Sequence, residues 1–329
     1  MKKKEKLGER KMIQIIQSHL DLMPEMPIPF GDDVSACSIG NRNLAILKTD
    51  MLVSKTDVPP SMTLWQAARK AVVMNISDFA AKGVKPRAML VSLGLPKDVG
   101  EKDVEELAKG LNAGAREYGA YVIGGDTGEA SDLIISLSLF GTAAKSEVML
   151  RRGAKPGDVL AVTGLFGKTP AGLKILLHSL NVEEKLRKVL VDSVLLPRAR
   201  LKEGLALRRS KAVSAAIDSS DGLAWSLHEI ARASDVGFTV NLLPIASEAE
   251  RFAEDYNFDP AEFALYGGEE YELILTVKPS LWSAAEKAAR RVKGRLLRIG
   301  TATAEKTVLF KTNGKKIVIQ PRGYEHFKA

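Results

Sequence analysis

Carboxylates recur in this chain beside short apolar runs, where a strand or helix of the protein interior would end. The recurring acids are Asp33, Asp50, Asp78, Asp126, Asp218 and Asp221. In α/β folds the ends of buried strands meet at the sheet edge where ligands usually bind. Mg²⁺ prefers oxygen ligands and is usually held by a few carboxylates together with substrate phosphates. Taken together, the acids indicate the chemistry of a hard cation such as Mg²⁺.

Taken singly, most of these acids have a structural explanation. Asp-Asp and Asp-Gly pairs form turns, and Asp often caps helices, so Asp221 also fits as the cap of the helix that follows it. Asp78 differs, because it lies inside the apolar segment 72–81. A carboxylate is costly to bury there without a cation or several donors. We therefore favour a ligand role for Asp78.

Other chemistries have little support in the sequence. Gly167-Lys168-Thr169 resembles the end of a phosphate-binding P-loop, but Val162 stands where that motif requires glycine. We interpret this segment as a turn before a helix, whose N–H groups could face an anion. Arg151 is a candidate phosphate partner or part of a solvated linker. The chain has no HExxH or GxSxG motif, and Cys37 is its one cysteine.

Apolar runs of strand length alternate with helical patterns, so we expect an α/β (α+β) protein. At about 150 residues per domain, 329 residues predict two mixed α/β domains. Charged residues, Gly and Pro gather in 146–158, so we place the domains at 1–150 and 151–329. Helices are expected at 63–82 and at 103–118, the second capped by Asp103. Strands are expected at 44–47, 88–93, 121–123, 133–140, 159–163, 215–217, 238–242, 272–277 and 315–319, and further helices at 169–180, 223–233 and 281–291.

The charge balance is basic, with 48 Lys and Arg against 40 Asp and Glu. A basic surface is typical of proteins that bind nucleic acid or phosphorylated metabolites, and also of an ordinary solvated surface. The longest uncharged apolar stretch, 133–144, is too short to span a bilayer. Charged residues follow the basic segment 1–6 where a signal peptide needs an apolar stretch. We therefore expect a soluble cytoplasmic protein.

Ten motifs, in this order, resemble those of the thiamine-monophosphate kinases, in the superfamily of aminoimidazole ribonucleotide synthetase and selenophosphate synthetase. They are GDD (31–33), KTDML (48–52), NISDFAAKGVKP (75–86), GGDT (124–127), RRGAKPGD (151–158), VTGLFGKTPAG (162–172), PRAR (197–200), IDSSDGLA (217–224), ALYGGEEYEL (264–273) and GYEHF (323–327). Together they extend over nearly the whole chain. The resemblance implies two domains of the aminoimidazole ribonucleotide synthetase-like type.

The resemblance also implies roles for individual residues. The implied Mg²⁺ ligands are Asp33, Thr49, Asp50, Asp78, Asp126, Asp218 and Asp221. The implied ATP contacts are Gly125, Asp126, Arg151 and Ser220, and the implied contacts to thiamine phosphate are Glu269 and Tyr324. Asp57 stands where many members carry a histidine near the substrate, so it is a candidate substrate contact. Lys48 replaces a hydroxyl residue at the edge of the implied metal site.

The activity implied is ATP-dependent phosphorylation of thiamine monophosphate to thiamine diphosphate, by direct in-line transfer with Mg²⁺. A phosphate monoester has its second pKa near ~6, so the nucleophile is already ionised and no catalytic base is expected. The resemblance further implies a homodimer formed through the N-terminal halves. Alternatives are another ATP-dependent enzyme of this superfamily, or a non-enzymatic protein that binds divalent cations or nucleic acid.

Overall fold

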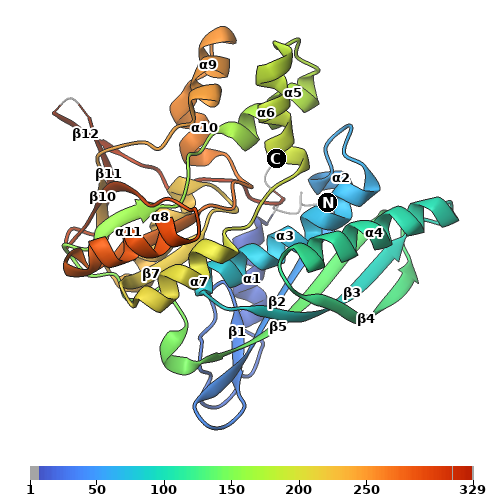
Figure 1. Ribbon diagram of the computed structural model, residues 1–329, viewed down its shortest axis with the longest axis horizontal. Helices are drawn as coiled ribbons and strands as arrows, with labels where there is room; N and C mark the ends of the chain where they lie inside the picture. Colours follow the sequence, from blue (N-terminus) through green and yellow to red (C-terminus); the bar gives the residue numbers. More distant parts are fainter. Residues whose placement is uncertain (1–6, 313, 328–329) are drawn as a thin grey trace, which may run out of the picture.

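The chain forms two β-sheets with helices packed against them, in a computed structural model that describes residues 7–312 and 314–327 (Figure 1). The basic segment 1–6 therefore lies outside the described residues. The first sheet has the strand order β1-β2-β5-β3-β4, and the second has the order β12-β11-β8-β10-β6-β9-β7. The expectation of mixed α/β structure is confirmed.

The first sheet consists of β1 (Ser35–Ser38), β2 (Asn43–Val53), β3 (Pro86–Leu95), β4 (Tyr121–Glu129) and β5 (Ile134–Ala144). The second consists of β6 (Val159–Val162), β7 (Val213–Asp218), β8 (Gly237–Val240), β9 (Leu273–Val277), β10 (Leu297–Thr303), β11 (Val308–Thr312) and β12 (Lys315–Val318). The α-helices are α1 (Glu9–Gln17), α2 (Ser54–Asp57), α3 (Leu64–Lys82), α4 (Glu101–Glu117), α5 (Lys168–His178), α6 (Glu184–Leu195), α7 (Leu201–Ser210), α8 (Leu223–Ser234), α9 (Ser247–Asp255), α10 (Pro260–Tyr266) and α11 (Trp282–Arg291). Among these described helices, none combines the length and the apolar content needed to cross a bilayer.

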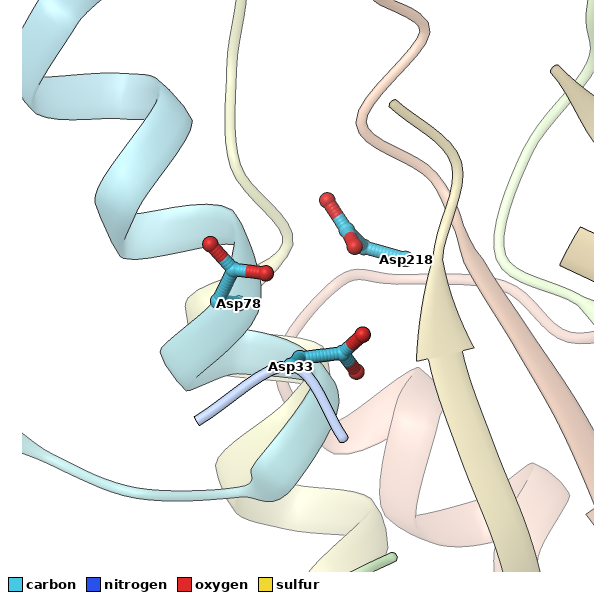
Figure 2. A group of neighbouring side chains, drawn as sticks. All are labelled: Asp33, Asp78 and Asp218. Atoms are coloured by element: carbon cyan, nitrogen blue, oxygen red, sulfur yellow. The ribbon is translucent and has the colours of Figure 1, made fainter. Parts of the chain in front are cut away.

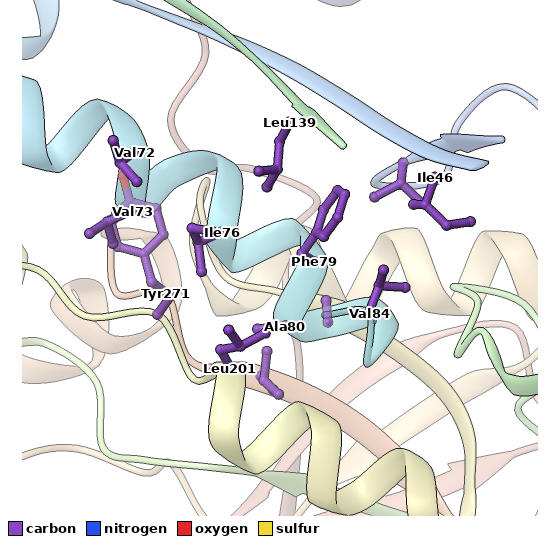
Figure 3. Close-up of a cluster of buried hydrophobic side chains, with 14 of the residues drawn as sticks. Ile46, Val72, Val73, Ile76, Phe79, Ala80, Val84, Leu139, Leu201 and Tyr271 are labelled. Atoms are coloured by element: carbon purple, nitrogen blue, oxygen red, sulfur yellow. The ribbon is translucent and has the colours of Figure 1, made fainter. Parts of the chain in front are cut away.

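Helix α3 is the central element, because it packs against the first sheet on one side and the second half of the chain on the other. Figure 3 shows Ile46 and Leu139 of the first sheet on one side of α3, and Leu201 and Tyr271 on the other. Thr63 begins the helix with a capping box, and Gly83 ends it in the left-handed conformation at φ 64°. A helix buried on both sides needs apolar residues all round.

Strand β2 alternates between two faces, as a half-buried strand does. Leu44, Ile46 and Leu52 are buried on the inner face, toward α3. Lys48 and Asp50 occupy the same inner face in the middle of the strand, because they lie at even spacing from these residues. The apolar ends therefore pack into the core and leave two charged side chains facing inward between them.

Several sequence expectations need correction. Helix α4 begins at Glu101, and Asp103 lies inside its first turn, where its carboxylate accepts from the Gly100 N–H at 2.9 Å. The Tyr121–Ile123 strand is an exposed edge strand, and it continues through Asp126. Residues 184–210, for which no element was expected, form α6 and α7.

Candidate active site

Three aspartates far apart in the sequence form one buried cluster. Asp33 comes from the loop before β1, Asp78 from α3 and Asp218 from the last position of β7. One carboxylate oxygen of each lies within 4.8 Å of the other two. Figure 2 shows the three side chains reaching into the space between these elements. Because their residues are at most 6% exposed, their charge must be neutralised by the surroundings.

Three cations of the protein surround the cluster. Lys82 Nζ lies 2.7 Å from Asp33 Oδ2, and Arg151 Nε donates to Asp33 Oδ1 at 2.6 Å. Lys48 Nζ lies 3.0 Å from Asp78 Oδ2. Among the described residues, Asp218 forms no ion pair. Its Oδ2 instead accepts a hydrogen bond from Ser77 Oγ at 2.6 Å. The three cations therefore pair with Asp33 and Asp78 and not with Asp218.

The surroundings set the three pKa values apart. Burial alone would raise the pKa of Asp33, but Arg151 and Lys82 outweigh it and hold that pKa below its usual value. For Asp78, burial raises the pKa well above its usual value, and Asp218 adds to the rise. Burial likewise raises the pKa of Asp218 to about 6. Burial thus disfavours the ionised forms of Asp78 and Asp218 despite the three cations nearby.

These features fit a hard divalent cation. The donor atoms are all carboxylate oxygens, which is the ligand type that Mg²⁺ prefers. Asp33 Oδ2 is buried and, although near Lys82 Nζ, accepts no well-directed hydrogen bond from the described residues. Burial, together with the neighbouring carboxylates, raises the pKa values of Asp78 and Asp218, and a bound cation would offset this cost of their ionised forms.

Thr49 and Asp50 lie next to the cluster on β2 and point to opposite faces of the sheet. Asp50 Oδ1 lies 3.3 Å from Lys48 Nζ, so this ammonium joins Asp50 to Asp78. The Thr49 hydroxyl donates to the Leu137 carbonyl at 2.8 Å and is used within the sheet. Thr49 also lines a cavity of about 400 Å³ together with Asp33 and Lys48.

Gly125 and Asp126 lie apart from the cluster, exposed on the edge strand β4. Register aligns Asp126 with Ser92, Ser136 and Met51 on successive strands. Three strand spacings amount to about 14 Å between Asp126 and β2. Gly125 has a structural reason for its identity, since a Cβ there would lie 1.9 Å from the Val91 carbonyl oxygen.

Ser220 and Asp221 lie in the loop between β7 and α8, next to Asp218. Helix α8 has Gly222 as its N-cap, so the cap role considered for Asp221 is not what the structure has. Burial raises the pKa of Asp221 to about 6. Asp221 lies outside the group of three aspartates described above. Ser220 is exposed, and its carbonyl accepts from the Glu269 N–H at 2.6 Å.

Arg151 is tied to the cluster. Its guanidinium contacts Asp33 through two nitrogens, donates to the Gly31 carbonyl at 2.9 Å and lies 3.3 Å from Glu229 Oε2. Burial works against its charged form, but Asp33 outweighs it and raises the pKa of Arg151. Arg151 therefore positions the GDD loop.

A second, larger cavity, of about 810 Å³, lies beside the first turns of α3. Asp57, Glu269 and Tyr324, expected from three distant motifs, all line it. Lys70 of α3 also lines the cavity, and its ammonium lies 2.6 Å from Glu269 Oε1. At 1.5 Å per residue, Lys70 and Asp78 are about 12 Å apart along α3. One helix thus connects the cavity to the acidic cluster.

The local backbone presents Glu269 to this cavity. Glu269 and Tyr271 both have positive φ, at 61° and 51°, a region that non-glycine residues rarely occupy. Their N–H groups donate to the carbonyls of Ser220 and Ser219, which ties the loop to the Asp218 segment. Asp57 is held differently, because its Oδ2 accepts from the Val53 N–H at 2.7 Å.

The start of α5 binds a protein carboxylate. Glu270 Oε1 accepts from the Gly167 N–H at 2.6 Å and from the Thr169 N–H at 3.3 Å. The N–H groups that the sequence suggested could face an anion are therefore used by Glu270. Burial raises the pKa of this carboxyl to about 7.

Two buried lysines of the site, Lys70 and Lys82, were not predicted, although α3 carries a signal for both. Lys70 and Lys82 lie in a helix whose other residues are mostly apolar, and both are at most 1% exposed. A fully buried lysine needs an acidic partner, so each predicts a carboxylate nearby. The sequence shows Lys48 in place of a hydroxyl residue, but it does not predict that this lysine lies between Asp50 and Asp78.

Comparisons with known proteins agree with this geometry. The family model "AIR synthase related protein, N-terminal domain" matches residues 31–143, and the C-terminal domain model matches residues 155–311. The chain is 35% identical to the thiamine-monophosphate kinase of Nitrosopumilus maritimus over 98% of this chain and 99% of that protein. It is 39% identical to the Pyrococcus horikoshii enzyme of the same name, over 75% and 76% of the two chains. A solved structure described as "AaThiL complexed with AMPPCP and TMP" superposes with a TM-score of 0.85 and 29% identity, covering 97% of each chain.

Proposed function

The chain belongs to the AIR synthase related family and, within it, to the thiamine-monophosphate kinases, and on this premise we propose how its site catalyses the reaction. ATP donates its terminal phosphoryl group to thiamine monophosphate, which gives ADP and thiamine diphosphate. The main structural support for this assignment is that α3 contributes a residue to both sites. Asp78 belongs to the acidic cluster, and Lys70 lines the larger cavity.

Asp33, Asp78 and Asp218 would hold Mg²⁺, with Asp50 and Asp221 as further ligands from adjacent segments. Thr49 remains a candidate ligand, because a hydroxyl that donates its proton to the Leu137 carbonyl keeps its oxygen lone pairs. Bound Mg²⁺ would supply positive charge to the phosphates of two anionic reactants. The buried carboxylates are suited to this role because Asp78 and Asp218 carry raised pKa values in the protein alone.

The larger cavity is the site we assign to thiamine monophosphate. Glu269 offers negative charge to the cationic thiazolium ring, and Tyr324 offers an aromatic face for it. Asp57 lines the same cavity and is a further proposed substrate contact. The attacking phosphate oxygen is ionised at neutral pH, because the second pKa of a phosphate monoester is ~6, so the reaction needs no protein base.

ATP would bind beside the cluster, on the side of the smaller cavity. Ser220 is exposed in the loop that carries Asp218 and is available for a phosphate or ribose contact. Arg151 remains a proposed ATP contact, and its ion pair with Asp33 holds its guanidinium beside the cluster. Gly125 and Asp126 remain proposed ATP and metal contacts that require a second copy of the chain.

A homodimer explains how Asp126 reaches a metal site. Within one copy, Asp126 lies about 14 Å from β2, three strand spacings away. The outer face of the first sheet exposes Leu47, Met51 and Leu90, and β4 exposes Ile123 at its edge. An apolar sheet face and edge of this kind is typical of a protein interface. Packing two copies through this face would bring the β4 of one copy toward the other.

The proposal also includes the domain division, the cellular location and the class of ligand. The chain divides into an ATP- and Mg²⁺-binding domain at 1–150, which also forms the dimer, and a C-terminal domain at 151–329. The enzyme works in the cytoplasm. It acts on small phosphorylated molecules, and no observation favours nucleic acid as its ligand.

A coupled ADP-release assay with thiamine monophosphate as the acceptor tests the function. We expect ADP release to depend on both the acceptor and Mg²⁺, and thiamine diphosphate to form in equal amount. Thiamine without its phosphate serves as the matched control, because it lacks the nucleophilic oxygen. ADP release that ignores the acceptor would overturn the assignment.

A further inference from the structure

The ammonium of Lys48 occupies a central position beside the acidic cluster. Lys48 Nζ lies 3.0 Å from Asp78 Oδ2 and 3.3 Å from Asp50 Oδ1. The side chain is 19% exposed, so it is largely removed from solvent. Lys48 and Asp50 share the inner face of β2 because they are two residues apart in a strand. The strand therefore holds this ammonium beside Asp50 and aims both at α3.

The other two cations of the site contact different acids. Lys82 lies between Asp32 and Asp33, and Arg151 binds Asp33. Within the described residues, the ion pairs of Asp50 and Asp78 both run to Lys48. Lys48 is thus the cation that neutralises this part of the site.

A metal ion and this ammonium compete for one place. Mg²⁺ binds carboxylate oxygens at about 2.0–2.1 Å, so an ion shared by Asp50 and Asp78 would lie between their oxygens. Lys48 Nζ lies there, within hydrogen-bonding distance of both. Two cations cannot occupy this space without strong repulsion.

We propose that Lys48 is a resident cation that takes the place of one divalent ion between Asp50 and Asp78. Its role is to position these two carboxylates before ATP binds and to reduce by one the number of metal ions that the free enzyme accepts. Lys48 is a positioning residue, since it acts through the aspartates. This inference rests on the proposed function, because it assumes that the cluster binds Mg²⁺.

The test counts metal ions in the absence of nucleotide. Mn²⁺ serves as the probe, and electron paramagnetic resonance measures the free ion during titration of the full-length protein. The variant Lys48→Thr removes the ammonium and restores a hydroxyl residue suited to a strand. Lys311→Thr is the matched control, because Lys311 is an exposed strand lysine remote from the site in sequence and sheet.

We expect Lys48→Thr to bind one more Mn²⁺ per chain than the wild type and the Lys311→Thr control. Its melting temperature should also be lower in EDTA and should rise more with added Mn²⁺ than that of the wild type. Equal Mn²⁺ numbers for wild type and Lys48→Thr would overturn the inference while leaving the kinase assignment standing. If the wild type binds no Mn²⁺ at all, the proposed metal site itself fails. If Lys48→Thr folds in neither EDTA nor Mn²⁺, the inference is also overturned, because the divalent ion should replace the lost charge.

Discussion

Lys82 Nζ lies 2.7 Å from Asp33 Oδ2, and neither side chain is exposed to solvent. The same ammonium lies 2.7 Å from Asp32 Oδ1 and donates to the Ala216 carbonyl at 2.9 Å. Lys82 therefore joins the end of α3, the GDD loop and β7, which are the three segments that carry the acidic cluster. This buried ammonium therefore helps to set the geometry of the acidic cluster.

Replacing Lys82 by methionine is expected to destabilise the protein. The methionine fills the space, but Asp32 and Asp33 lose a buried partner, at a cost of about 3–5 kcal/mol. Urea unfolding measures the change, with Lys109→Met as the control because Lys109 pairs with Glu105 on an exposed helix face. A loss below about 1 kcal/mol would contradict this role.

Asp78→Asn is expected to lower kcat by about 100-fold or more, because the site loses one charged oxygen ligand. The fold should remain intact, since asparagine keeps the shape and relieves a buried carboxyl whose pKa is well above its usual value. Steady-state kinetics and thermal melting in EDTA measure the two effects. Asp192→Asn, on the exposed face of α6, is the control. A folded Asp78→Asn enzyme with near wild-type kcat would argue against the metal assignment.

Tyr324→Ala is expected to weaken thiamine monophosphate binding by about tenfold, which corresponds to the loss of one aromatic contact with a cation. Tyr324 lines the larger cavity and stands edge-on to His326 at 5.0 Å between ring centroids. Calorimetry with the substrate and with an ATP analogue compares the two sites in the same variant. Equal losses for both ligands would remove Tyr324 from the substrate site.

Ile123→Glu is expected to convert the proposed dimer into monomers, because it places a charge on the exposed edge of β4. Activity should fall on the order of 100-fold, since Asp126 would no longer reach the partner's site. Sedimentation and kinetics measure both effects. Val189→Glu, at another exposed apolar position, is the control. A dimeric Ile123→Glu protein, or a fully active monomer, would refute the interface.

Glu270 makes stability depend on pH in a defined direction. Its folded pKa is raised to about 7, from 4.5, with burial as the main cause. Between these values the folded state binds more protons than the unfolded state, so this carboxyl makes stability fall as pH rises toward 7. Glu270→Gln removes this dependence while keeping the Gly167 and Thr169 bonds. Relative to wild type, it should gain about 1–3 kcal/mol between pH 5 and pH 8.

Urea unfolding at the two pH values checks the Glu270 prediction. Glu250→Gln is the control, because Glu250 is exposed and should change stability equally at both pH values. A Glu270→Gln protein whose stability relative to wild type is the same at pH 5 and pH 8 would show that Glu270 is ionised throughout.

The sequence predicted the elements with strong local signals. The helix expected at 63–82 and the strands expected at 88–93, 133–140 and 272–277 follow from spacing and turn residues alone, and the structure has elements at each of these places. The edge position of β4 did not follow, because Tyr121-Val122-Ile123 has the composition of a buried strand. Which strand lies at an edge depends on sheet order, and sheet order depends on packing between distant segments.

By itself, the sequence indicated which carboxylates are candidates for the chemistry, because a carboxylate next to apolar runs must find positive charge once the chain folds. Only the tertiary structure decided which of these side chains lie together and which cation contacts which acid. It brings Asp33, Asp78 and Asp218 together, leaves Asp126 on an outer strand, and places Lys48 where a metal ion would otherwise bind. The physical reason is that charge can be read from residue types, whereas distances between residues far apart in the chain arise only from packing.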